Sequence, residues 1–480
     1  MDFFFKPSSV AIVGASPVLT KAGGVIFQNF VHNKQHDLFT GELYPVNPTY
    51  ESVFDFKCYP SVSSIGKPVD CIVVVVPANA VCSVLEDSVR GGVKGAVIIT
   101  SGFSEIGNHD LEAKVLEIAK KGNMRIIGPN CLGVYDAWSG VDTLFLPENK
   151  ILSTGREVVA TPRPVRGPIV LISQSGALGA AALDYMAGRA MGVRALVSLG
   201  NRADVAEDEL LRYFRNDEWT RVILLYIEGI RNGRAFLEAA SSVSLVKPIV
   251  AIKVGRSSSG ARAAASHTAA MSGQDEVYES AFELSGIVRA RNLDEFFDMG
   301  RAFLYQPPAK GNRVAILTNA GGPGVMAADT LEESGLSVVE LSGETKSKLE
   351  RLKAEGKILP YASIRNPVDL SGTATSQMFE TALRVLVDDD EIDAVLVITL
   401  HHTPAVLDDV VGKVIHACYD RRKPVIACDI GSTEMAEEIR SRFEKLRVPA
   451  YTTPERAARA LYALVTYGKY LEHVKKHGLL

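Results

Sequence analysis

The residue with the clearest chemical potential is His267, which lies in a run of small residues from Gly255 to Gly273 (GRSSSGARAAASHTAAMSG). Such a run offers little apolar area for packing, so it predicts a loop that presents one strongly nucleophilic side chain. The serines from Ser257 to Ser259 are weak nucleophiles without an activating base, whereas a neutral imidazole is available at physiological pH. The sequence therefore favours His267 as a nucleophile, with an ordinary surface or core histidine as the alternative.

A carboxylate that could orient this histidine is Glu228, at the end of the apolar run VILLYIEG. A carboxylate at a strand end can accept a hydrogen bond from one imidazole nitrogen and leave the other nitrogen free to react. The alternative is a solvated carboxylate with no function. The sequence alone does not exclude it.

Three segments combine an apolar run, a glycine-containing turn and a helix-like stretch. They begin at Val10, Ile169 and Val314, and their turns are GAS, SQSGALG and TNAGGPG. A helix that follows such a turn directs free backbone N–H groups and the positive end of its dipole at an anion. We therefore expect three candidate anion sites, although helix capping or a tight turn would explain each motif taken singly.

The first of these segments departs from a dinucleotide-binding fingerprint. Its spacing is not GxGxxG, and the second strand ends in YPVNP without an acid to bind a ribose, which disfavours NAD. The phosphates of CoA need the same helix N-terminus but not that acid, and Lys21 could add positive charge. Further turns follow the next strands at the carboxyl edge, where open α/β sheets bind ligands. They are Val76-Pro77-Ala78, Thr100-Ser101-Gly102-Phe103 and Gly128-Pro129-Asn130-Cys131.

The elements that must position these residues are short runs rich in Val and Ile, such as VAIVGAS, CIVVVVP, PIVLISQSG and VAILTNAGG, which recur between helical stretches. Strands that are apolar on both faces belong to parallel sheets covered by helices, so we predict a doubly wound α/β fold throughout. Clusters of Pro, Gly and basic residues predict linkers near 154–167 and 305–312. With a length of 480 residues, we expect three domains, 1–150, 151–305 and 306–480.

Composition excludes several classes of function. A net charge of -4 without a basic run gives no reason to expect nucleic acid or an anionic membrane as partner. The six cysteines form no CxxC pair, which argues against zinc, iron-sulfur clusters and a disulfide framework. His401-His402 is interpreted as a loop and not a metal site, because adjacent histidines point apart on an extended backbone. With no signal peptide and no membrane-length apolar run, we expect a cytoplasmic protein.

Taken in order, GAS, GPNCLG, SQSGALG, YIEG, ASHTAAMSG and TNAGGPG resemble the ADP-forming (NDP-forming) acetyl-CoA synthetase family, acyl-CoA synthetases related to succinyl-CoA synthetase. The resemblance covers essentially the whole chain. It implies a Rossmann-like CoA-binding domain followed by two flavodoxin-like domains. It also implies an alpha subunit that pairs with a separate ATP-grasp beta subunit, commonly as an α2β2 heterotetramer, since no ATP-grasp module occurs before Leu480.

The resemblance also implies roles for individual residues. His267 would be the phosphorylated histidine and Glu228 its orienting carboxylate. The paired phosphate sites would be the helix starts at Ser175 and Gly176 and at Gly322 and Gly324. The CoA site would be lined by Gly14, Ser16, Lys21, Pro77, Ser101 and Asn130.

In the reaction that the resemblance implies, phosphate attacks acetyl-CoA or another acyl-CoA and gives an acyl phosphate and free CoA. His267 then takes the phosphoryl group and releases the acid, and ADP, held with Mg on the partner subunit, receives it last. Two rivals stay open: an NAD-dependent oxidoreductase and a non-catalytic CoA-binding regulatory or scaffold protein. The sequence does not distinguish acetate from a branched-chain or aryl acid, or ADP from GDP.

Overall fold

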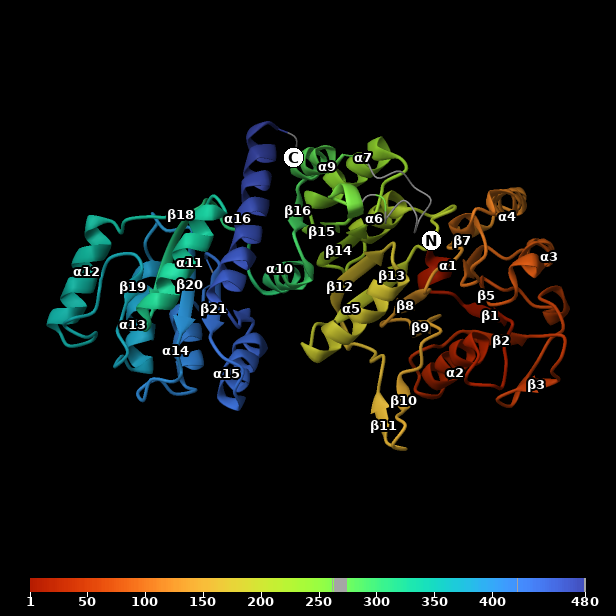
Figure 1. Cartoon of the computed structure of the whole chain (residues 1–480), viewed down its shortest axis with the longest axis horizontal. Helices are drawn as coiled ribbons and strands as arrows, with labels where there is room; N and C mark the ends of the chain where they lie inside the picture. The colour runs from red at the N-terminus through yellow and green to blue at the C-terminus, as the bar shows by residue number, and fades with distance from the viewer. Residues whose placement is uncertain (261, 263–273, 421, 479–480) are drawn as a thin grey trace. The chain divides into compact units, whose positions relative to one another are not determined.

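The computed structural model describes residues 1–260, 262, 274–420 and 422–478. It divides into two compact units, Met1–Ser285 and Gly286–Leu480 (Figure 1). Both units contain parallel strands connected by helices, which confirms the predicted doubly wound α/β class. Each unit is described by itself.

The first sheet of the first unit has the strand order β2-β1-β5-β6-β7, and all its strands are parallel. The strands are β1 (Ser9–Val13), β2 (Glu42–Val46), β5 (Cys71–Val74), β6 (Gly95–Ile98) and β7 (Arg125–Ile127), and the helices are α1 (Asp2–Phe5), α2 (Ala22–Gln35), α3 (Ala78–Arg90) and α4 (His109–Lys121). A small hairpin of β3 (Ser52–Val53) and β4 (Phe56–Lys57) follows β2. Because β2 and β5, the next two strands of this sheet along the chain, lie on opposite sides of β1, a crevice is expected at the carboxyl ends of β1 and β5.

Two glycines let α2 lie directly against the end of β1. Gly14 has φ +98°, and a Cβ there would meet the carbonyl oxygen of Val75 at 2.6 Å. A Cβ on Gly23 would overlap the carbonyl oxygen of Gly14. Glycine is therefore required at both positions for the backbone itself to form the floor of the crevice.

The second sheet of this unit contains, in order, β15-β14-β12-β13-β8-β9. The strands are β8 (Val134–Asp136), β9 (Val141–Asp142), β12 (Arg166–Ser173), β13 (Val193–Ser198), β14 (Val222–Ile227) and β15 (Ile249–Lys253), and the helices are α5 (Gly176–Gly188), α6 (Glu207–Arg215), α7 (Gly233–Ser244) and α9 (Asp275–Ser285). The strands β12 to β15 pair in parallel, whereas β8 pairs antiparallel with β13 and β9. Residues 134–142 thus extend the second sheet, although they precede the predicted domain limit at residue 150.

The segment 154–167, predicted as a linker, contains regular structure. Strand β11 (Glu157–Val159) lies within it and pairs antiparallel with β10 (Asn149–Ile151), so the two form a hairpin. Gly155 at the tip has φ +82°, a conformation that glycine adopts without strain. The basic and glycine-rich composition of 154–167 therefore belongs in part to a hairpin and not only to a linker between domains.

The second unit contains a parallel sheet in the order β18-β17-β20-β21-β22, with β19 paired to β17. The strands are β17 (Arg313–Thr318), β18 (Ser337–Val338), β19 (Val368–Asp369), β20 (Ala394–Thr399), β21 (Val425–Asp429) and β22 (Ala450–Tyr451), with β16 (Ile287–Ala290) at the start of the unit. The helices are α10 (Leu293–Tyr305), α11 (Gly321–Glu333), α12 (Gly343–Ala354), α13 (Ser376–Val387), α14 (Val410–Ala417), α15 (Glu434–Lys445) and α16 (Pro454–Lys476). Helix α16 packs against α10 and α11.

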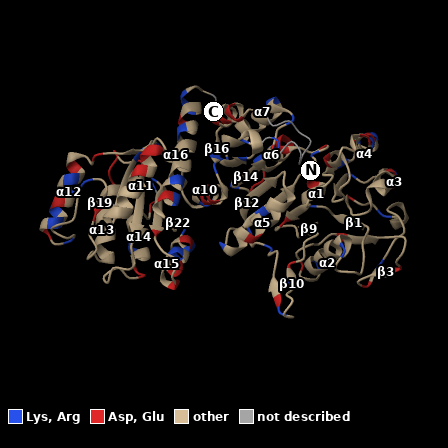
Figure 2. Cartoon of the chain, in the orientation of Figure 1, with Lys and Arg blue, Asp and Glu red and all other residues tan. Residues whose placement is uncertain are grey.

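Charged side chains of both signs are mixed on the outer helices, for example on α12 and α15 (Figure 2). Among the described residues, no helix is both long enough and apolar enough to cross a membrane.

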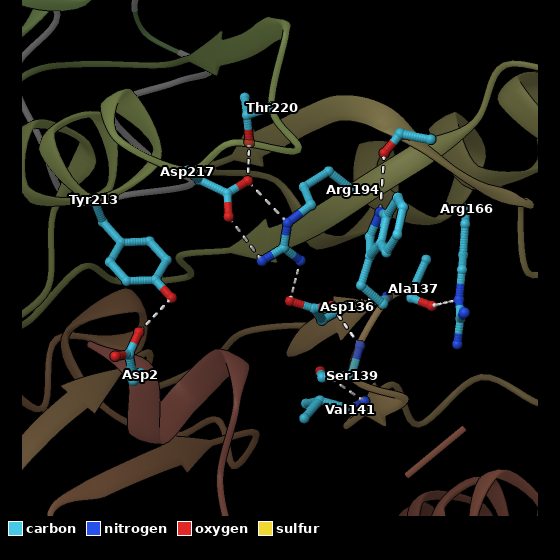
Figure 3. A network of polar contacts seen from close by, with 12 residues as sticks. Asp2, Asp136, Ala137, Ser139, Val141, Arg166, Arg194, Tyr213, Asp217 and Thr220 are labelled. Atoms are coloured by element: carbon cyan, nitrogen blue, oxygen red, sulfur yellow. Dashed lines mark hydrogen bonds and ion pairs between the residues drawn. The ribbon is translucent and has the colours of Figure 1, made fainter. Parts of the chain in front are cut away.

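A buried arginine lies where β8 joins the second sheet (Figure 3). The guanidinium of Arg194 on β13 pairs with Asp136 on β8 and, at 3.0 Å, with Asp217. The side chains of Arg194 and Asp136 are both fully buried. Trp138 and Trp219 stack beside this group with ring centroids 4.8 Å apart. These contacts attach the segment after the first sheet to the second sheet.

Candidate functional site

A cavity of about 520 Å³ opens at the carboxyl ends of β1, β2 and β5, as the strand order predicts. Gly14, Ser16, Lys21 and Pro77, four of the residues that the sequence predicts to line a CoA site, lie on its wall. The hydroxyl of Ser16 accepts a hydrogen bond from the backbone N–H of Val18 at 3.1 Å, which fixes the turn before α2. Lys21 immediately precedes α2, so a positive charge stands beside the helix N-terminus.

A second cavity, of about 710 Å³, lies between the two sheets of the first unit. Pro77, Ser101 and Asn130 from the first sheet line it together with Ser175 and Gly176 at the start of α5. Residues 75–77 line both cavities, so the two are adjacent. The structure thus brings residues predicted for CoA and residues predicted for phosphate to one place.

The start of α5 has the features of an anion-binding site. Ser175 is the N-cap residue, and its side-chain oxygen accepts a hydrogen bond from the N–H of Leu178 at 3.3 Å. The first N–H groups of a helix have no partner within the helix, and here they lie at the wall of the second cavity. A Cβ at Gly176 would meet the Leu132 side chain at 3.3 Å, so a larger residue would occupy space at this wall.

Gln174, which the sequence analysis did not single out, connects this helix start to Glu228. Its side-chain oxygen accepts hydrogen bonds from the N–H groups of Glu228 at 2.7 Å and Gly229 at 3.1 Å. Its side-chain nitrogen donates to the Gly229 carbonyl at 2.8 Å and to the carboxylate of Glu207. Because β12 and β14 are neighbouring parallel strands, Ser175 and Glu228, which follow their carboxyl ends, lie at the same edge of the sheet.

Glu228 is buried, and its role as the carboxylate that orients a histidine stays a prediction. Burial and the negative charge of Glu228 raise the pKa of Tyr226 to about 12. His267, the predicted nucleophile, lies outside the described residues.

The remaining predicted phosphate residues, Gly322 and Gly324, lie in the first turn of α11 in the second unit. This helix follows Ala320 and has no side-chain cap, so its first N–H groups have no side-chain acceptor at the N-cap position. A Cβ at Gly324 would meet Thr318 at 3.2 Å and Pro367 at 3.4 Å, which explains the glycine by close packing.

The prediction that the side chains of His401 and His402 point apart is wrong. Their rings stack with centroids 4.1 Å apart. The N–H of Thr403 bonds the carbonyl of Leu400 at 3.2 Å, so the backbone turns here and the alternation of an extended strand does not apply. The pair does lie in a turn after β20, and His401 is held by Asp429 at 2.6 Å. Within the described residues, no cluster of His, Cys, Asp or Glu side chains is suited to a metal ion.

Asn201 and the apolar wall of the second cavity were not predicted from the sequence. Asn201 is the last residue of the run RALVSLGN, so it is a polar residue after a strand end, the same signal that pointed to Ser101 and Asn130. The apolar wall consists of Ile99, Leu132, Phe145 and Leu146. Phe145 and Leu146 precede the β10–β11 hairpin and carried no signal, because isolated apolar residues in a loop have no distinctive pattern.

Comparison with known protein families matches three parts of the chain. Residues 8–137 match a CoA binding domain, residues 166–303 a succinyl-CoA ligase like flavodoxin domain, and residues 314–470 a ligase-CoA domain. The predicted identities of the three folds are therefore confirmed, and the limits 1–150, 151–305 and 306–480 stay a prediction.

Individual relatives match over nearly the full length. The alpha subunit of ADP-forming acetate–CoA ligase I from Pyrococcus furiosus is 39% identical over 481 residues, which is 98% of each chain. The ADP-forming acetate–CoA ligase of Methanocaldococcus jannaschii is 39% identical over 99% of this chain and 66% of its own. The solved structure of acetyl-coenzyme A synthetase 1 from Ca. Korarchaeum cryptofilum, in complex with phosphate and ADP, is 36% identical, with a TM-score of 0.88 over 99% of this chain and 98% of that one. The chain described here thus belongs to the family of ADP-forming acetate–CoA ligases.

Proposed function

We propose that this chain is the alpha subunit of an ADP-forming acetate–CoA ligase. The enzyme interconverts acyl-CoA, ADP and phosphate with the free acid, ATP and CoA. One observation carries the proposal: a single cavity joins the strand ends of the CoA-binding sheet to the N-terminus of α5 in the second sheet. Thioester and phosphate must meet for the first step, and this cavity offers both binding surfaces.

In the proposed complex, the phosphates of CoA lie beside Gly14, Ser16 and Lys21, where backbone N–H groups and a lysine supply positive potential. The thioester extends past Pro77 into the second cavity, and phosphate binds at Ser175 and Gly176. A phosphate oxygen attacks the thioester carbon, the C–S bond breaks with its electron pair going to sulfur, and CoA leaves as the thiol with the proton that the hydrogen phosphate gives up. The N–H groups at the start of α5 stabilise the phosphoryl charge during this step.

The second step moves the phosphoryl group to His267. An imidazole nitrogen attacks phosphorus, the bond from phosphorus to the acyl oxygen breaks, and the acid leaves as a carboxylate. Glu228 accepts a hydrogen bond from the other imidazole nitrogen and stabilises the cationic ring that forms. The buried Gln174 holds the backbone of Glu228 and is a positioning residue for this step.

The final acceptor is ADP, held with Mg²⁺ by an ATP-grasp beta subunit, and the assembly is an α2β2 heterotetramer in the cytoplasm. Two relatives from Pyrococcus furiosus that match 98% of this chain are named alpha subunits, which supports a separate beta subunit. This chain covers 66% of the Methanocaldococcus jannaschii relative, so that relative has a further region in the same polypeptide.

The cavity also favours a class of acid. Among the described residues, no charged side chain lines the second cavity, and one wall consists of Ile99, Leu132, Phe145 and Leu146. A second carboxylate on the acyl group would be buried there without a counter-ion, which is costly. We therefore propose monocarboxylic acids with an apolar acyl group as substrates.

The test is transfer of radiolabelled phosphate to the purified chain in the presence of acetyl-CoA, with His267→Ala and the control His402→Ala. We expect an acid-labile, base-stable label in wild type and in the control variant, and none in His267→Ala. Label retained in His267→Ala would overturn the phosphohistidine step. If wild type binds CoA but takes no label with any acyl-CoA, even with an ATP-grasp partner present, a CoA-binding regulatory protein is the better description.

A further inference from the structure

The two sheets of the first unit are joined by a line of hydrogen bonds, here called the inter-sheet seam, between residues 126–132 and 198–205. The N–H groups of Asn201, Ala203 and Val205 donate to carbonyls of Pro129, Gly128 and Ile126 at 2.9 to 3.1 Å. A Cβ at Gly200 would overlap the carbonyl oxygens of Pro129 and Asn130, so only glycine permits this approach. The seam forms the part of the second cavity where the two sheets meet.

One side chain of the seam, Asn201, bonds to residues that follow two strands of the first sheet, β6 and β7. Its side-chain nitrogen donates to the hydroxyl of Ser104 at 3.1 Å and to the carboxylates of Glu105 at 2.6 Å and Glu112 at 2.8 Å. Its side-chain oxygen accepts from the side-chain nitrogen of Asn130 at 3.2 Å. Asn201 itself lies on the cavity wall.

The two carboxylates also accept hydrogen bonds from the loop that carries Ser101, so they connect this loop to Asn201. Glu105 accepts a hydrogen bond from the N–H of Phe103 at 3.1 Å, and Glu112 accepts one from the hydroxyl of Ser104 at 2.7 Å. Burial alone would raise the pKa of Glu105, but the hydrogen bonds from Asn201 and from the backbone hold that pKa below its usual value. The side-chain amide of Asn201 therefore donates hydrogen bonds to both carboxylates.

We propose that Asn201 is a positioning residue for CoA binding, which fixes the loops of Ser101 and Asn130 at the second cavity from the opposite sheet. The proposal rests on the proposed function, because it takes this cavity as the place where the thioester end of CoA binds. A residue that only holds the sheets together would affect stability and leave affinity for CoA unchanged in the folded protein.

The decisive variant is Asn201→Asp, which keeps the shape of the side chain, removes its two N–H donors and adds a third carboxylate. The matched control is Asp204→Asn, also isosteric and in the same seam. Asp204 accepts from Arg125 at 2.9 Å and from the N–H of Ile126 at 2.8 Å but does not line the cavity. CoA affinity of the full chain is measured by calorimetry, with circular dichroism and thermal unfolding to show that each variant is folded.

We expect Asn201→Asp to bind CoA at least tenfold more weakly at pH 7.5 and Asp204→Asn to stay within twofold of wild type. If Asn201→Asp does not fold, Asn201→Ser, which adds no charge, takes its place with the same expected loss of affinity.

Wild-type affinity in a folded Asn201 variant, or an equal loss in Asp204→Asn, would overturn the proposal. A wild-type chain that binds no CoA would instead overturn the proposed function, so the two failures are distinguishable.

Discussion

Replacing Arg194 with methionine tests how the segment that links the two sheets is held in place. In the native chain the guanidinium lies between Asp136 and Asp217, with its side chain fully buried (Figure 3). Methionine keeps much of the apolar stem and removes the charge and all the donors. Two carboxylates, 0% and 7% exposed, would then stand next to an apolar side chain.

The size of the effect depends on the hydrogen bonds that Asp136 and Asp217 keep after the arginine is removed. Removing one partner of a buried ion pair costs about 3–5 kcal/mol. Asp136 still accepts from the N–H groups of Trp138 at 2.9 Å and Ser139 at 3.0 Å, and Asp217 from the hydroxyl of Thr220 at 2.6 Å. These remaining bonds limit the penalty, so we expect Arg194→Met to lower the free energy of unfolding by about 3 kcal/mol.

The assay is urea unfolding followed by tryptophan fluorescence. The chain has two tryptophans, Trp138 and Trp219, and they stack against each other in the first unit, so the signal reports on that unit. The Arg194 guanidinium lies 5.1 Å from the Trp219 ring, so the spectrum also reports local rearrangement.

The control is Arg234→Met, where the arginine side chain is 90% exposed and pairs with Glu238 four residues along α7. We expect no measurable change in its midpoint, because exposed pairs of this kind contribute little. A loss below about 1 kcal/mol in Arg194→Met would refute the reasoning, since it would mean that both carboxylates find full compensation without the arginine. Adding Asp136→Asn to Arg194→Met should cost less than the sum of the two single variants, because it removes one of the stranded charges.

Three further predictions concern the site itself. Gly23→Ala should weaken CoA binding and lower the unfolding midpoint, because the added Cβ overlaps the Gly14 carbonyl oxygen. The control Gly188→Ala, whose added Cβ has no atom within 4 Å, should change neither the CoA affinity measured by calorimetry nor the midpoint in urea. Burial raises the pKa of the Cys131 thiol from 9.0 to about 12, so this group stabilises the fold below pH 9 and loses that contribution as pH rises towards 12. Unfolding measured from pH 8 to 11 should show a smaller alkaline loss in Cys131→Ala than in wild type, and an equal loss would contradict the assignment. With the assembled enzyme, acetate and longer apolar acids should support thioester formation and succinate should not; measurable turnover of succinate would show that the uncharged cavity does not contain the acyl group.

The sequence was informative where the determinants are local. Apolar runs without alternation predicted parallel sheets, and the carboxyl ends of parallel strands share an edge. Gly14, Pro77, Ser101 and Asn130 therefore had to gather at one edge of the first sheet, and the structure places them there. Ser175 at the start of α5 follows the same logic, because a cap and a glycine after a strand define a helix N-terminus.

Only the tertiary structure decided which segments of the two sheets in the first unit contact each other. Asn201 bonds to Ser104 from 97 positions away, and Arg194 bonds to Asp136 from 58 positions away. No periodicity encodes such pairs, because they depend on how β8 joins the second sheet and how closely Gly200 lets two loops approach. The stacking of the His401 ring on the His402 ring was likewise missed, although the loop was predicted, because His401 is held by Asp429 on a neighbouring strand. Backbone conformation is dictated by neighbours in the sequence, whereas the polar contacts that complete this site are made between segments that only packing brings together.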